Sequence, residues 1–389
     1  MRILEVLDSF YPSVDGPNSV MVSLALTLKK MGHSVDVLVP KYKQIVEVEG
    51  LTVHRCKSFP AKLGYRAAFP CFDGKIKKLI KKGNYDVIHL HSPVLLGHFA
   101  LKQGKKLGIP VVFTFHTKFK DEIKNRSKSR LIQNISMNYI MGCINRSDCV
   151  TTVSRGSIAT LEEYGYKKCG EVTVIHNGTD MPPMASDPSD IAKIRKELSL
   201  EGNFGFLFAG RLAEVKNIQF SLKALAKVKE RGVNNFRFVI VGDGDYGKNL
   251  RQQVDALNLN DNVIFVGKIT DRKILANYFA ACYAMLFPSL FDTASITIPE
   301  AAANGLPSIM IKGSSSSEVI EGGVSGFLWE NDADVWADEM IKLINDPSIA
   351  EKVGQGALEK VYSSWDDIAR EYVKLYKRLI ADAEDKKRR

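Results

Sequence analysis

The chain has 389 residues, 45% of them hydrophobic and 25% charged, which is the composition of a globular protein large enough for two domains. No apolar run approaches the ~20 residues that cross a bilayer, and the chain starts directly with an apolar stretch, so we expect neither a membrane span nor a signal peptide. The six cysteines are scattered without a CxxC pair, which favours reduced thiols and a cytoplasmic location.

The net charge of +10 is unevenly distributed. Residues 1–180 carry a net charge of +12 and residues 181–389 one of −2, and from Arg55 to Arg130 there are 18 Lys and Arg against 4 Asp and Glu. Such a basic region attracts an anionic membrane surface or a nucleic acid, unless it is only a solvated face. Because it is rich in lysine and has few aromatic residues interleaved with arginine, we expect no nucleic-acid partner.

Short apolar runs alternate with amphipathic stretches through the first half of the chain. This alternation is typical of βαβ units around a parallel sheet, with helices expected at 20–31 and 76–82. The predicted strands are 3–7, 35–39, 87–90, 111–115, 149–153 and 172–175. A segment rich in Pro, Asp and Ser at 179–190 predicts a linker.

The alternation restarts after the linker. Strands are predicted at 204–208, 236–241, 263–266, 283–287 and 308–311. We therefore expect an α/β protein of two Rossmann-like, doubly wound parallel-sheet domains, 1–180 and 181–364, facing each other across a ligand-binding cleft. Residues 365–389 predict an amphipathic helix up to residue 380, expected to pack back on the first domain, and a frayed basic tail.

Candidate site residues in the first half follow predicted strands. Gly16 lies in the loop after the first strand, where a glycine lets backbone amides approach a phosphate or sugar at a helix N-terminus. His116 ends the strand at 111–115 and would line the cleft, although an isolated histidine is more often structural. His89 and His91 face the same side of their strand, and no third ligand is spaced to complete a zinc site.

In the second half, a strand leads into Gly210, Arg211 and, five residues further on, Lys216. Two fixed cations at the start of a helix suit a diphosphate. Gly242 follows the next strand and precedes an Asp-Gly-Asp turn, which could hold a divalent metal ion. Aspartates are favoured at the start of a helix without any metal ion, because they cap backbone amides and complement the helix dipole. The two cations already neutralise a diphosphate, so we expect no metal ion.

The segment 291–309 places Asp292 and Glu300 eight positions apart, before a buried helix and at its start. Acids are favoured at helix N-termini, which explains Asp292 but explains Glu300, at the start of the buried face, less well. The backbone amides of Ala294, Ser295 and Ile296 would be free at this helix N-terminus.

Together these motifs resemble family four of the retaining, nucleotide-sugar-dependent glycosyltransferases. The similarity is carried by Gly210-Arg211-x4-Lys216-Asn217, by Gly242-x-Gly244, and by Asp292-x7-Glu300 followed by Ala-Ala-x-x-Gly-x-Pro. It extends to the stretch 314–329 and to N-terminal motifs at 10–16, 91–93 and 115–117, which are similar to those of bacterial members that glycosylate membrane lipids or lipid-linked glycans.

The resemblance implies a GT-B fold and a role for each candidate residue. Arg211 and Lys216 would bind the donor diphosphate beside Gly210 and Gly242, and Gly16 would approach it from the first domain. Glu300 would bind the ribose hydroxyls, Asp292 would bind hydroxyls of the donor sugar, and His116 would lie beside that sugar. Amides of the donor site would come from Ala294, Ser295 and Ile296.

The resemblance also implies the reaction. The expected enzyme is a retaining hexosyltransferase without metal ion or cofactor, which uses a nucleotide-sugar, most simply a UDP-sugar, as co-substrate. Its acceptor would be a lipid or lipid-linked glycan, and the protein would lie peripherally at the inner face of the cell membrane. The basic region supports membrane docking, as does the partly apolar segment 130–144, which equally predicts a core helix.

Three alternatives stay open at this point. The same fold could glycosylate a soluble small molecule, or the chain could be a non-catalytic protein that binds sugar or nucleic acid.

The family usually has Glu at the position of Asp292 and Phe-Gly at Ala294-Ser295. We therefore expect the donor sugar to be the point at which this chain differs from its relatives.

Overall fold

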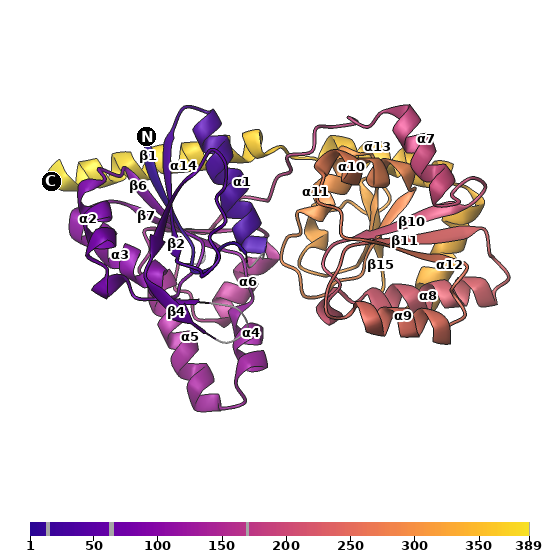
Figure 1. The fold of residues 1–389 in the computed structure, drawn as a ribbon, viewed down its shortest axis with the longest axis horizontal. Coiled ribbons are helices and arrows are strands. Elements are labelled where there is room, and N and C mark those ends of the chain that lie inside the picture. Colours follow the sequence, from indigo (N-terminus) through magenta and orange to yellow (C-terminus); the bar gives the residue numbers. More distant parts are fainter. Residues whose placement is uncertain (13–15, 62–65, 169–170, 389) are drawn as a thin grey trace. The chain divides into compact units, whose positions relative to one another are not determined.

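The computed structural model describes residues 1–12, 16–61, 66–168 and 171–388, which form two compact α/β units (Figure 1). The first unit comprises Met1–Asn177 and Trp365–Arg389, and the second comprises Gly178–Ser364. Part of the N-terminal motif at 10–16 and Cys169 lie outside the described residues.

The first unit is built on a seven-stranded parallel sheet in the order β3-β2-β1-β6-β7-β8-β9. Its strands are β1 (Arg2–Val6), β2 (Ser34–Pro40), β3 (Thr52–Cys56), β6 (Val87–Leu90), β7 (Val111–Phe115), β8 (Cys149–Thr152) and β9 (Thr173–Val174). A separate antiparallel pair is formed by β4 (Ser58–Pro60) and β5 (Arg66–Ala68). The central strands are almost wholly buried, as expected for a parallel sheet covered on both faces.

Helices cover this sheet, and the last helix of the chain is one of them. They are α1 (Gly16–Lys30), α2 (Gly74–Lys82), α3 (Leu95–Leu107), α4 (Phe119–Arg126), α5 (Arg130–Ile144), α6 (Gly156–Glu163) and α14 (Trp365–Arg388), with the short 3-10 helix η2 (Pro70–Phe72). Figure 1 shows α14 in yellow beside the strands of the first unit, and it packs against α1. The helix continues to Arg388, so it extends beyond the predicted end at residue 380 and includes three residues of the basic tail that was expected to be frayed.

The second unit repeats the architecture with a six-stranded parallel sheet in the order β12-β11-β10-β13-β14-β15. Its strands are β10 (Phe204–Ala209), β11 (Phe236–Val241), β12 (Val263–Gly267), β13 (Ala284–Phe287), β14 (Ser308–Ile311) and β15 (Gly326–Trp329). Its helices are α7 (Pro188–Glu197), α8 (Ile218–Glu230), α9 (Gly247–Ala256), α10 (Arg272–Ala281), α11 (Thr297–Ala303), α12 (Ala333–Asn345) and α13 (Ser348–Lys360), with 3-10 helices η4 (Glu214–Lys216) and η5 (Ser317–Val319).

The second sheet separates two apolar cores because successive side chains of a strand point to opposite faces. Phe206 and Phe238 belong to the core that contains residues of α8 and α12. Leu207 and Val239, one position along, belong to the other core, with residues of α10 and α11. Both faces of β10 and β11 are therefore buried, which explains why these strands are apolar, apart from Arg237 near the start of β11.

In each sheet the strand order reverses once, and we call the place between the two strands where this happens the reversal point. The neighbours there are β1 and β6 in the first unit, and β10 and β13 in the second. In doubly wound sheets, ligands bind outside the carboxyl ends of the two strands at such a point. The predicted α/β class and the two parallel sheets are confirmed.

Within the described residues, no helix is both long and apolar enough to cross a bilayer. Four of the cysteines expected to fill cores are buried: Cys56, Cys143, Cys149 and Cys282. Cys71, in contrast, is exposed.

Two glycines hold the loops after β10 and β11 in contact. Gly242 has φ of +143°, and a β-carbon there would lie 1.8 Å from the carbonyl oxygen of Gly210. Any side chain at this position would therefore separate the two loops or distort the backbone.

We expect Gly242→Ala to destabilise the protein by at least about 2 kcal/mol, because a methyl group cannot fit against Gly210 and alanine disfavours this backbone conformation. Urea unfolding measures the change. Gly74→Ala is the control, since Gly74 lies at the start of α2 with no atom within 4 Å of an added β-carbon. Equal stability of the two variants would contradict the close contact between the loops.

Candidate active site

The predicted donor-site residues of the second unit lie at the point where its strand order reverses. Gly210 and Arg211 directly follow β10, and Lys216 ends η4 in the same loop. Asp292 lies in the loop after β13, which is the strand next to β10. Strands that are adjacent in the sheet thus bring together residues 76 or more positions apart. The side chain of Arg211 is exposed.

Lys216 and Asp292 form an ion pair at this point. Lys216 Nζ lies 2.7 Å from Asp292 Oδ1, and the two side chains are only 18% and 19% exposed. The other carboxylate oxygen, Asp292 Oδ2, is buried and has no hydrogen-bond partner among the described residues. A lysine ammonium has three donors, so an incoming phosphate could bind Lys216 while Asp292 Oδ2 accepts from a hydroxyl group.

Hydrogen bonds fix the two loops that carry this ion pair. Ser289 Oγ accepts from the amide of Asp292 at 3.3 Å and donates to the carbonyl of Val215 at 3.3 Å. Asn217 donates from its side-chain amide to the carbonyl of Pro288 at 3.1 Å. The backbone beside Lys216 is therefore tied to the backbone before Asp292, which holds the pair in place.

Glu300 lies in α11 and is 7% exposed, and the structure pairs it with an arginine that the sequence did not indicate. Arg272 donates from Nη2 to Glu300 Oε1 at 2.7 Å and also contacts the carboxylate of Asp180. Burial raises the pKa of Glu300, and Arg272 opposes this shift. Arg272 thus favours the ionised carboxylate, the form that accepts two hydroxyl hydrogen bonds.

Residues 294–296 lie directly before α11, as predicted. Ser295 accepts from the amides of Thr297 and Ile298, through its hydroxyl and its carbonyl, and the carbonyl of Ile296 accepts from the amide of Glu300. The side chains of Ala294, Ser295 and Ile296 are all partly exposed. The three residues follow Asp292 in the loop that precedes α11, so they are close to the ion pair in sequence.

The Asp-Gly-Asp turn does not cap the helix that follows it, because α9 begins after Tyr246 without a side-chain cap or an acid in its first turn. Asp243 Oδ1 accepts from the amide of Gly244 at 2.7 Å, and both Asp243 and Asp245 are exposed. Gly244 packs a bare α-carbon against the backbone of Leu212, where a β-carbon would lie 2.4 Å from the carbonyl oxygen. The glycines therefore serve the close approach of two loops.

In the first unit, Gly16 begins α1, is exposed and has open space around its α-carbon. His116 directly follows β7 and is 9% exposed. His116 Nε2 lies 2.9 Å from His91 Nδ1, and His91 Nε2 lies 2.7 Å from Glu5 Oε2. The histidine that the sequence placed alone at a strand end is thus part of a buried polar cluster.

The cluster contains the one group of side chains with metal-binding potential in the described residues. Glu5, His89 and His91 each offer a ligand atom within 4.8 Å of the others. Glu5 Oε2 lies 2.7 Å from His91, which is a hydrogen-bond distance, and His89 is already bonded to Thr114 and Tyr376. We therefore interpret the group as a hydrogen-bond network rather than a metal site.

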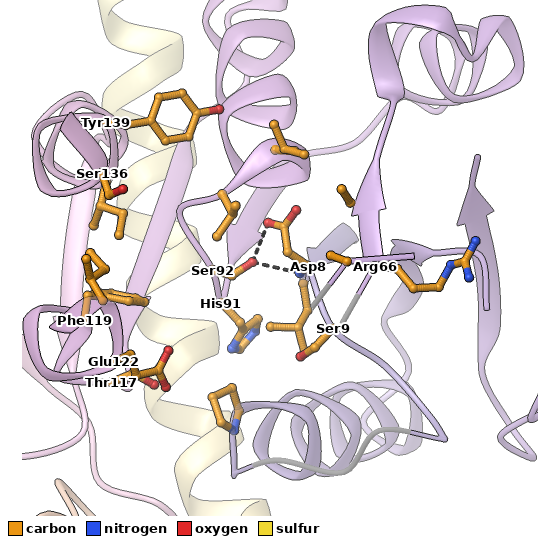
Figure 2. Close-up of a pocket in the computed structure, with 18 of the residues that line it drawn as sticks. Asp8, Ser9, Arg66, His91, Ser92, Thr117, Phe119, Glu122, Ser136 and Tyr139 are labelled. Atoms are coloured by element: carbon orange, nitrogen blue, oxygen red, sulfur yellow. Dashed lines mark hydrogen bonds between the residues drawn. The ribbon is translucent and has the colours of Figure 1, made fainter. Parts of the chain in front are cut away.

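A cavity of about 570 Å³ opens at the reversal point of the first sheet, and sequence reasoning did not indicate it. Figure 2 shows Asp8, Ser9, His91 and Ser92 at one side, after β1 and β6, with Phe119 and Tyr139 from α4 and α5 across from them. Most of the wall is apolar and includes these side chains: Leu7, Val94, Leu95, Ile132, Ile135 and Ile140.

Asp8 is one of three charged residues that line this largely apolar cavity, with Arg66 and Glu122. Its carboxylate accepts from the hydroxyl of Ser92 at 2.7 Å and from the amides of Leu96 and Gly97, at 2.7 and 3.3 Å, at the start of α3 (Figure 2). Burial raises the pKa of Asp8, and these hydrogen bonds oppose the shift. Asp8 therefore both caps α3 and provides an acceptor at the cavity.

Comparison with known proteins gives one consistent family. The family model "Glycosyltransferase Family 4" matches residues 14–181, and "Glycosyl transferases group 1" matches residues 190–360. The alpha-monoglucosyldiacylglycerol synthase of Streptococcus pneumoniae is 27% identical over 90% of this chain and 80% of its own length. The N-acetyl-alpha-D-glucosaminyl L-malate synthase of Bacillus anthracis is 25% identical over 96% of both chains.

A solved structure agrees with this result. HepE of Anabaena in complex with UDP-glucose superposes with a TM-score of 0.77 at 20% identity and covers 97% of this chain and 100% of its own. At this identity the likeness shows the fold.

The buried histidines predict that stability falls in acid. Burial lowers the pKa of His91 to about 4, and burial also places the pKa of His116 well below its usual value. Both folded-state values lie below that of the unfolded chain, about 6.5, so the unfolded state binds more protons between these limits. Their contribution to stability is complete above pH 6.5 and is lost as the pH falls toward 4.

Urea unfolding at pH 7.5 and pH 5 measures this loss, and we expect a lower midpoint at pH 5. The His91→Gln variant should show a smaller difference between the two pH values, because it removes one of the two groups. If His91→Gln shows the same difference between its midpoints at pH 7.5 and pH 5 as the wild type, His91 is not a neutral, buried histidine.

Proposed function

Because the chain belongs to glycosyltransferase family 4 and has the GT-B fold of two Rossmann-like units, we propose that it transfers a hexose from a UDP-sugar to a lipid or lipid-linked glycan. The transfer retains the anomeric configuration and uses no metal ion or cofactor. The observation that carries the donor half of the proposal is the Lys216–Asp292 pair beside Arg211 at the reversal point of the second sheet.

The donor would bind the second unit through groups of opposite character. Arg211 and Lys216 bind the diphosphate, and Glu300, oriented by Arg272, binds the ribose hydroxyls. Asp292 Oδ2, which lacks a partner among the described residues, accepts from a hydroxyl of the transferred sugar. The complex of HepE with UDP-glucose supports a UDP-sugar as the donor.

The chemistry requires charge stabilisation more than proton transfer. When the glycosidic bond breaks, positive charge develops on the sugar and negative charge on the leaving diphosphate. Arg211 and Lys216 stabilise that leaving group, so a divalent cation is not needed. Front-face attack by the acceptor hydroxyl then retains configuration without a protein nucleophile. The alpha linkage in the name of the Streptococcus relative supports retention.

The cavity in the first unit supports a lipid acceptor. Its wall is largely apolar. The carboxylate of Asp8 and the polar groups of Ser92 and His91 lie at one side, and Glu122 and Arg66 also line it. Apolar pockets with a few polar groups suit a ligand with an apolar body and a polar head. The diacylglycerol product of the Streptococcus relative has this character.

A membrane-facing surface is supported by the helices around this cavity. The C-terminal half of α5 is core, with Ile140 and Ile144 buried, but Leu131 is 69% and Ile135 60% exposed in its N-terminal half. The lysines of α2 and α3 are exposed, and α3 packs against both α2 and α5. Exposed apolar side chains beside lysines bind the interface of an anionic bilayer. We therefore propose that the protein binds peripherally at the inner face of the cell membrane.

A soluble acceptor is the second candidate, since the Bacillus relative is named for malate. An apolar cavity of about 570 Å³ favours the lipid over a small polyanion.

We expect Lys216→Ala to lower turnover of the donor at least about tenfold, because the leaving diphosphate loses a cation. Hexose transfer to diacylglycerol or a glycosylated diacylglycerol measures it, with thermal unfolding as a check on the fold. Lys223→Ala on the exposed side of α8 is the matched control. Equal turnover of wild type and Lys216→Ala would overturn the assignment of the donor site.

We expect Leu131→Asp to weaken binding to vesicles with anionic lipid, because it places a negative charge at the exposed tip of α5. Leu131 does not line the cavity, so transfer to a short-chain acceptor dispersed without a bilayer should remain near wild type. Ile274→Asp, at a residue of the second unit that is 48% exposed, is the control. If Leu131→Asp floats with anionic vesicles as wild type does, α5 is not the docking surface.

A further inference from the structure

A buried chain of hydrogen bonds leads from the centre of the first sheet to His116. It begins at Glu5 of β1, which is fully buried, passes through His91 after β6, and ends at His116 after β7. Exposure rises along it from 0% to 2% to 9%. The planes of the two imidazole rings differ by only 15°, so the two rings are nearly parallel.

The chemistry of Glu5 sets the direction of every hydrogen bond in this chain. An ionised carboxylate only accepts, so His91 donates to Glu5 Oε2 from Nε2. A neutral His91 then has a bare Nδ1, and the bond of 2.9 Å requires His116 to donate from Nε2. His116 Nδ1 is therefore the acceptor nitrogen of that ring.

The charge states agree with this direction. Burial raises the pKa of Glu5, but His89 and His91 outweigh it and hold that pKa at about 2, so the carboxylate is ionised. Burial lowers the pKa of His91 to about 4, which keeps this imidazole neutral at physiological pH.

Stability does not explain why β1 carries a carboxylate here. The neighbouring residues Leu4 and Val6 fill the core, and an apolar side chain at position 5 would avoid the cost of burying a charge. Glu5 Oε1 has no hydrogen-bond partner among the described residues, so the charge is incompletely compensated. A buried carboxylate that fixes a histidine tautomer is a known arrangement in enzymes.

We propose that Glu5 and His91 are positioning residues that hold His116 in the Nε2-protonated tautomer, so that Nδ1 accepts a hydrogen bond from a sugar hydroxyl during transfer. This inference rests on the proposed function, because His116 needs a sugar to act on. It assigns a role to two buried residues of the first unit, one on β1 and one after β6.

Histidine-selective ¹⁵N NMR tests the tautomer directly, since two-bond correlations distinguish Nε2–H from Nδ1–H, and His116→Gln assigns the signal. Wild type should show Nε2–H at His116. Glu5→Gln is nearly isosteric and uncharged, and its amide can donate to His91 Nε2. We expect this variant to reverse the chain and give Nδ1–H at His116.

Kinetics of the same variants test the consequence. Glu5→Gln should lower kcat about tenfold or more with the donor KM changed less than about threefold, because the lost interaction acts during transfer. His91→Gln can still donate to Glu5 and accept from His116, so it should keep Nε2–H at His116 in the NMR spectrum. Thr151→Val removes a hydrogen bond to Thr114 but leaves the hydrogen bonds between Glu5, His91 and His116 in place. Its kcat should be close to that of wild type.

Two results would overturn the proposal: Nδ1–H at His116 in the wild type, or a kcat for Glu5→Gln equal to that of wild type. A wild type that transfers no sugar but shows the tautomer and its reversal would contradict the proposed function and support the arrangement of Glu5, His91 and His116.

Discussion

Parallel strands place all their carboxyl ends at one edge of a sheet, and a reversal of strand order leaves that edge open at one point. Both units obey this constraint, and the chain places its chemistry at the two openings. In the second unit, the loops after β10 and β13 meet there and pair Lys216 with Asp292. In the first, the ends of β1 and β6 border the apolar cavity and the buried chain to His116.

Most of the strands that the sequence predicted are continuous apolar runs buried on both faces, but the partly buried edge strands β9 and β12 were predicted as well. β3 was missed because Thr52–Cys56 lies at the sheet edge and is mostly half-buried, with His54 and Arg55 among its five residues. β15 was missed because Gly326–Trp329 is short and starts with a glycine, which disfavours a strand by itself. An edge strand that is not a continuous apolar run depends on its neighbours, and sequence patterns do not report neighbours.

The site residues likewise fall into those that the sequence located and those that only the structure reveals. Lys216, Asp292 and Glu300 follow strands or begin a helix, so local patterns and the family resemblance located them. Arg272 begins a helix without any motif, and its contact with Glu300 arises only when α10 and α11 pack together. Glu5 is a single acid in an apolar strand, and its meaning depends on His91, which lies 86 positions away. The cavity is formed by segments from five or more elements, which no local pattern can describe.

The most direct test of the central claim is transfer of labelled sugar from UDP-glucose, GDP-mannose and ADP-glucose to vesicles that contain diacylglycerol or monoglucosyldiacylglycerol. The donor site and the apolar cavity predict a glycolipid product with UDP-glucose, formed in the presence of EDTA and with the α configuration. If the protein is folded and binds the vesicles but neither transfers nor hydrolyses any of the three donors, the claim that it is an active glycosyltransferase is contradicted.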